Sequence, residues 1–62
     1  MPTATQVLIV STHESKRLPL SRPRTLHEIR ELVVGAILRH GGDVSGVVVS
    51  LPVHSSTAIV NL

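Results

Sequence analysis

Residues 25–42, TLHEIRELVVGAILRHGG, decide how this chain folds, because they contain the start signal, the periodicity and the stop signal of one helix. Thr25 and Glu28 have the spacing of a capping box, in which each side chain accepts a hydrogen bond from the other residue's backbone N–H. Gly41 and Gly42 follow the last turn, where glycine adopts a left-handed conformation at no steric cost. The spacing therefore predicts a helix over residues 25–40.

The apolar residues of this helix fall into two groups when they are placed 100° apart around its axis. A broad stripe that can cover a sheet contains Leu26, Ile29, Leu32, Val33, Ala36 and Ile37. Val34 and Leu38 lie on another side of the helix. In a domain of 62 residues a helix that is apolar on so many sides is expected to meet a second subunit, and we predict self-association through Val34 and Leu38.

Three predicted strands surround the helix. Residues 6–12, QVLIVST, are rich in β-branched side chains and form the first strand, and residues 44–53 and 57–62 form the second and third. Residues 13–24, HESKRLPLSRPR, contain two prolines and few apolar residues, and we predict a basic surface loop. The predicted fold is a single α+β domain over residues 1–62, with one helix on a three-stranded mixed sheet whose first two strands are parallel.

Composition excludes several classes of protein. The chain has no cysteine and no aromatic residue, which excludes disulfide scaffolds and zinc–cysteine modules. A mean hydropathy of +0.33 and a net charge of +2 are the opposite of the signature of disorder. A domain this short buries only about 60% of the surface that its unfolded chain exposes. We therefore expect a homo-oligomer.

The expectations for cellular location and for cofactors rest on motifs that are missing from the sequence. There is no apolar run of the roughly 20 residues that a membrane helix needs, and no signal peptide is recognisable, so we expect a cytoplasmic protein with no membrane contact. The four histidines have no spacing that brings three ligands together, so we predict no metal and no cofactor.

A candidate site for an anionic partner follows from the predicted topology. Ligands of open α/β sheets bind beyond the carboxyl ends of parallel strands, and the positive end of the helix dipole is expected there too. The residues that this argument selects are His13, Lys16, Arg17, Arg22, Arg24, Thr25, His54 and Ser55. The first hypothesis is therefore a small binding or regulatory module for an anion. A nucleic-acid partner would be held through its duplex backbone, because no aromatic side chain is present to stack on bases.

Two other functions come from different classes. The alternative is a protein–protein assembly or adaptor module without an anion site, in which the basic segment only keeps the chain soluble. The third is an enzyme. The opening Met1-Pro2, followed by strand, helix and strand, resembles the small tautomerases of the 4-oxalocrotonate type. That resemblance implies Pro2 as the catalytic base, whereas the long segment at 13–24 departs from the family's pattern; no other catalytic residue is assigned.

Overall fold

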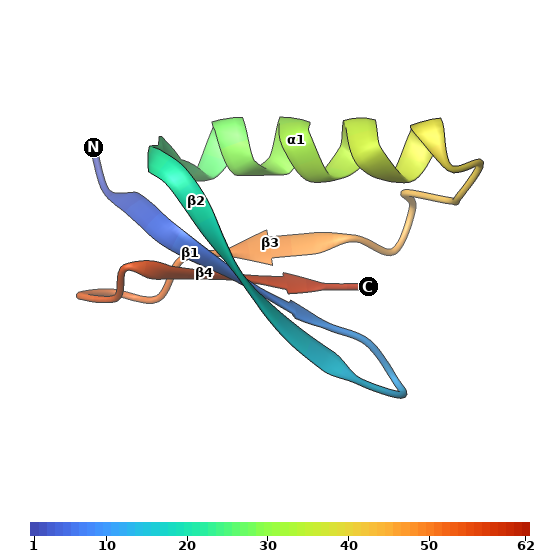
Figure 1. The fold of residues 1–62 in the computed structure, drawn as a ribbon, viewed down its shortest axis with the longest axis horizontal. Coiled ribbons are helices and arrows are strands. Elements are labelled where there is room, and N and C mark those ends of the chain that lie inside the picture. The colour runs from blue at the N-terminus through green and yellow to red at the C-terminus, as the bar shows by residue number, and fades with distance from the viewer.

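A computed structural model describes all of residues 1–62 as a small α+β domain in which one helix lies across one face of a four-stranded mixed sheet (Figure 1). The chain forms the strands β1 (Thr3–Val10) and β2 (Ser15–Thr25), the helix α1 (Leu26–Arg39), and the strands β3 (Val48–Ser50) and β4 (Thr57–Asn61). The strand order is β2-β1-β4-β3. The α+β class is thus confirmed, but the sheet has four strands rather than three. The 14-residue helix α1 is too short to span a membrane.

The predicted basic loop at 13–24 is wrong, because most of it forms strand β2. A turn joins β1 to β2, closed by the Ser11 N–H bonding to the Glu14 carbonyl oxygen at 2.9 Å. From there β2 runs antiparallel to β1. Prolines and charged residues are typical of loops, but they are also typical of edge strands, where they prevent pairing with another chain. The predicted extended backbone before Pro19 and Pro23 is confirmed, since both prolines lie within the strand.

The pairing of β2 with β1 is interrupted by a bulge. Pro19 pairs with Gln6 and Arg24 pairs with Ala4, so residues 20–23 lie opposite the single residue Thr5. Extra residues on one strand bend it and increase its twist. The two central strands lie behind β2 where it crosses them in Figure 1, and the turn of the hairpin points away from the helix.

The predicted parallel pair is also wrong. The strand parallel to β1 is the last one, β4, with Val7 opposite Ala58 and Ile9 opposite Val60. Only residues 48–50 of the predicted strand 44–53 are paired, as the antiparallel edge strand β3. The segment before β3 is instead occupied by turns, one of them closed by the Ser45 N–H donating to Asp43 Oδ1 at 2.9 Å. Pro52 ends the strand on the other side, because it has no N–H to donate.

Both predicted helix ends are confirmed. The Thr25 side chain accepts a bond from the Glu28 N–H at 3.3 Å, while the Thr25 N–H donates to Glu28 Oε1 at 3.0 Å. The helix ends at Arg39 with His40 as its C-cap, and Gly41 follows with a φ of 75°. Local signals at residues 25–42 are therefore sufficient to place the helix.

The core lies between α1 and the two central strands. Only five residues of the chain are fully buried, and they are Ala4, Val7, Ile29, Ala58 and Val60. Ile29 is the single fully buried residue of the helix. The other face of the sheet has no helix over it (Figure 1). The small core leaves several large apolar side chains exposed, and these define the surfaces considered below.

Candidate functional site

The residues predicted to bind an anion do not gather at one end of the sheet. His13 follows the carboxyl end of β1, whereas His54 and Ser55 precede the amino end of β4. Because β1 and β4 are parallel, these two positions lie at opposite ends of the central strands. Thr25 pairs with Thr3 and therefore lies at the amino end. The predicted carboxyl-end cluster is wrong because it assumed the wrong parallel partner for β1.

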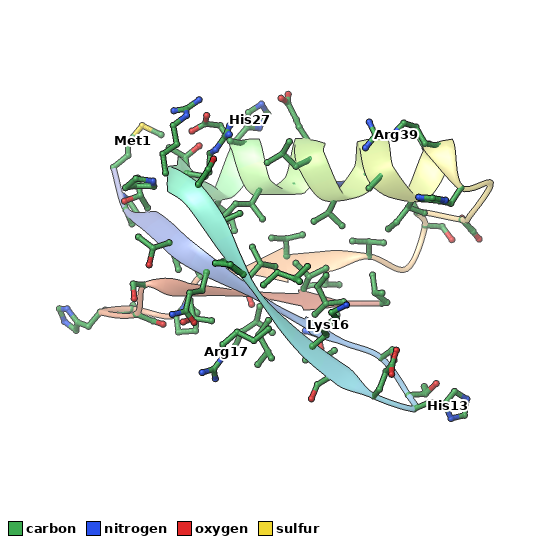
Figure 2. All side chains as sticks on the ribbon, viewed as in Figure 1. Met1, His13, Lys16, Arg17, His27 and Arg39 are labelled. Atoms are coloured by element: carbon green, nitrogen blue, oxygen red, sulfur yellow. The ribbon has the colours of Figure 1, made fainter.

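Lys16 and Arg17 are also separated, by the alternation of side chains along β2. Lys16 is opposite Ile9, which belongs to the helix-covered face, and Arg17 is opposite Leu8 on the other face. Figure 2 shows the two side chains pointing away from β2 in different directions, with His13 far out at the hairpin turn. The basic residues of β2 therefore do not form one continuous cationic surface.

Arg22 and Arg24 surround Glu28 at the start of α1. Their guanidinium groups lie 3.9 and 3.8 Å from Glu28 Oε2, which is ion-pair distance but longer than a hydrogen bond. The other carboxylate oxygen accepts from the Thr25 N–H at 3.0 Å and from the Thr25 hydroxyl at 3.1 Å. The chain thus supplies its own anion to the helix N-terminus, and one carboxylate faces two arginines. The buried Nε of Arg24 has no hydrogen-bond partner.

This arrangement makes stability depend on acid pH. Hydrogen bonds from Thr25, with smaller contributions from the two arginines, hold the pKa of Glu28 below its ordinary value of 4.5. The carboxylate therefore contributes its full stabilisation above pH 4.5, and this contribution is lost as the pH falls from there through the lower folded-state pKa. We expect the free energy of unfolding, measured in urea by far-UV circular dichroism, to decrease over that interval.

The variant E28Q isolates the contribution of Glu28. Glutamine keeps the acceptor oxygen of the capping box but does not titrate, so E28Q is expected to have a shallower loss of stability below pH 4.5. D43N is the matched comparison, because bonds from Ser45 also hold the pKa of Asp43 below its ordinary value of 3.8. A pH profile for E28Q that is as steep as that of the unchanged chain would contradict the assignment.

An apolar groove lies between α1 and β2. It has a volume of about 290 Å³, and eleven of its twelve lining residues are hydrophobic. We call it the α1–β2 groove; it is lined by Val7, Ile9, Leu18, Pro19, Leu20, Ile29, Leu32, Val33, Ala36, Ile37, Val60 and Leu62. Its volume is near the lower limit of ordinary ligand pockets, which are also mainly apolar.

Basic residues lie at both ends of the β2 wall of this groove. Alternation along the strand places Lys16, Leu18 and Leu20 on the helix-covered side of β2. Lys16 therefore lies next to the two leucines, at the end of the groove nearer the hairpin turn. Arg22 lies beyond them at the other end, within ion-pair distance of Glu28. The sequence analysis missed this groove, although the signal was present as the alternation of 16, 18, 20 and 22.

The two residues predicted to mediate self-association lie outside the groove. Val34 is half-buried and Leu38 is 58% exposed, and neither lines the α1–β2 groove. Successive helical turns place Val34 on the same side of α1 as Arg30, which lines a second hollow together with Val49 of β3. Self-association through Val34 and Leu38 remains a prediction.

The second hollow, of about 400 Å³, lies at the N-terminus of the chain and contains Pro2, Thr25, His27 and Arg30 among its lining residues. The tautomerase resemblance would make Pro2 a base. With Met1 attached, however, the Pro2 nitrogen is an amide nitrogen and cannot accept a proton as an amine does. The chain also departs from that family's pattern in forming a β-hairpin before its helix. No three histidine, aspartate or glutamate side chains are close enough together to bind a metal ion.

Comparisons with protein-family models, with curated proteins and with solved structures give no match to this chain. Its function must therefore be inferred from the surfaces described above.

Proposed function

We propose that this chain is a small protein-binding module whose α1–β2 groove holds an apolar segment of a partner protein, flanked at each end by an acidic residue. The observation that supports the proposal is the groove itself, with its hydrophobic lining between two basic ends. The proposal combines the two binding hypotheses drawn from the sequence, an anionic partner and a protein partner, in one surface.

The basic residues of β2 favour a partner segment with acidic residues at its two ends. Strand β2 carries four of the six lysine and arginine residues of the chain and no aspartate or glutamate. At the Arg22 end of the strand, the Glu28 carboxylate already bonds to Thr25 and faces two arginines. At the other end, Glu14 lies in the hairpin turn directly before the strand, two residues from Lys16. Because the strand itself has four basic residues and no acidic one, an acidic side chain of a partner is attracted to both ends of the groove.

The length of the segment follows from strand geometry. At about 3.3 Å per residue, the six steps from Lys16 to Arg22 correspond to roughly 20 Å of extended chain. A seven-residue extended peptide with acidic first and last residues spans the same distance. Because alternate residues of a strand share a face, the acidic and the apolar residues of this peptide must all stand at odd positions. The peptide ETVTLTE has that design, and KTVTLTK is the matched control with the same apolar residues and opposite charges.

We expect ETVTLTE to shift the backbone amide NMR signals of residues 15–22 and 29–37. KTVTLTK should bind at least about fourfold more weakly, because each of the two exposed charge pairs is worth about 0.2–1 kcal/mol and becomes repulsive in the control. Higher salt should weaken ETVTLTE binding. Equal binding of the two peptides would contradict the acidic flanks. If neither peptide binds and duplex DNA shifts the arginine signals instead, the protein-binding proposal is wrong and the nucleic-acid hypothesis replaces it.

A further inference from the structure

The face of the sheet opposite the helix carries an aliphatic cluster. Because Val7 and Ile9 point toward α1, the intervening Leu8 and the next residue, Val10, point to the other side. Register places Ile59 of β4 beside Leu8, and alternation along β3 places Val48 on the same side. We call this surface, made by Leu8, Val10, Val48 and Ile59, the helix-free face.

Polar residues of the helix-free face border this cluster, and one of them, Asn61, lies between Val10 and Val48 in the register. In the four strands its only charged residue is Arg17, on the edge strand β2 opposite Leu8, and the others are neutral side chains such as Gln6 and Asn61. An aliphatic centre with a charge only at its border is typical of the inner face of a sheet that packs on a second sheet, rather than of a sheet face in water.

The chain exposes more surface than is expected for a monomer of its mass, and the excess is similar to the area that one partner buries in a dimer. A monomer of 6.6 kDa is expected to expose about 3,900 Å², whereas this chain exposes 4482 Å². The excess of about 600 Å² is comparable to the roughly 800 Å² that each partner buries in a stable interface of standard size. With only five fully buried residues, the domain needs this cover whenever it folds. The molecule that is always present with a folding chain is another copy of the same chain.

We propose that two copies of this chain pack through their helix-free faces, with a twofold axis that runs along the strands midway between the two sheets. This axis places the β1 and β4 aliphatic residues of one copy on those of its partner. It also places β2 over the partner's β3, so that the two Arg17 side chains lie on opposite borders of the contact. Both α1–β2 grooves face outward in this dimer and remain free for the partner segment proposed above.

Sedimentation velocity with interference optics tests the proposal, because the chain has no tyrosine or tryptophan to follow by absorbance. We expect the unchanged chain to sediment as a dimer of twice its 6.6 kDa mass at tens of micromolar. V48K should raise the dissociation constant at least tenfold, since it buries a lysine near the partner's β2. V53K is the matched control: Val53 is 83% exposed in the turn after β3, outside the helix-free face, and V53K should remain dimeric.

Changing the sign of the charge at position 48 tests the proposed twofold axis, which places this position near β2 of the partner. A glutamate there can pair with Arg17 across the contact, so V48E should weaken the dimer less than V48K does. Circular dichroism checks that each variant is folded, and Val48 is 58% exposed in the single chain, so both changes are compatible with folding. A monomeric unchanged chain, or equal effects of V48K and V53K, would overturn the proposal. Dissociation by L32D but not by V48K would also overturn it, because the contact would then involve the groove.

Discussion

Replacing Ile29 by alanine is expected to lower the free energy of unfolding by about 2–5 kcal/mol, the usual cost of removing a large aliphatic side chain from a core. Ile29 is 1% exposed and is the only fully buried residue that α1 contributes. A domain of 62 residues has a total stability of about 3–9 kcal/mol. The I29A variant should therefore be largely unfolded, or should unfold at much lower urea concentration than the unchanged chain.

The matched control is L38A, on the same helix. Leu38 is 58% exposed, and removing most of its side chain should change the stability by no more than about 0.5 kcal/mol. Urea titration followed by far-UV circular dichroism measures both variants at one low protein concentration, because self-association makes the urea midpoint depend on concentration. If I29A and L38A have the same urea midpoint, the packing of α1 on the central strands is not as described.

The helix could be predicted from the sequence because its signals are local. Thr25 and Glu28 are three residues apart, and Gly41 follows the last turn directly, so the start and the end are each encoded within a few positions. The hydrogen bonds that fix these ends, such as Glu28 N–H to the Thr25 hydroxyl, join the same neighbouring residues. No information about distant parts of the chain is needed for this element.

The sheet could be predicted only in part because its pairing is non-local. The sequence indicates that residues 57–62 form a strand, and β4 confirms it, but nothing within the segment shows that it lies beside β1. Strand β2 was misread because its prolines and arginines are equally typical of a loop and of an edge strand. Two apolar residues in alternation, Leu18 and Leu20, were the signal that favoured a strand.

The error in topology carried over to the candidate site. The predicted anion site required strand ends to meet, and it was lost when β4 took the parallel position beside β1. The groove was missed for a related reason, since three of its wall residues, Leu18, Pro19 and Leu20, were assigned to a loop. Residue types could indicate that an anionic or apolar partner is needed, but only the pairing of β1 with β2 and β4 determines which residues share a surface.

Replacing Leu32 by aspartate is expected to weaken the binding of ETVTLTE by about tenfold to a hundredfold. Leu32 lines the α1–β2 groove and is 48% exposed, so its side chain is available to a partner. Loss of a buried leucine contact costs about 1.5–3 kcal/mol, and each 1.4 kcal/mol is a factor of ten in the dissociation constant. The new carboxylate also repels the acidic ends of the peptide.

Two further variants separate these causes. L38D introduces the same charge on the same helix outside the groove, and it should leave peptide affinity within about twofold of that of the unchanged chain. L32A removes the contact without adding charge, and its loss of affinity should fall between those of L38D and L32D. Equal weakening by L32D and L38D would show that only net charge matters, which contradicts a role for the groove. Because Leu32 lies on the opposite side of the sheet from Val48, the L32D chain should still dimerise, so loss of peptide binding tests the groove alone.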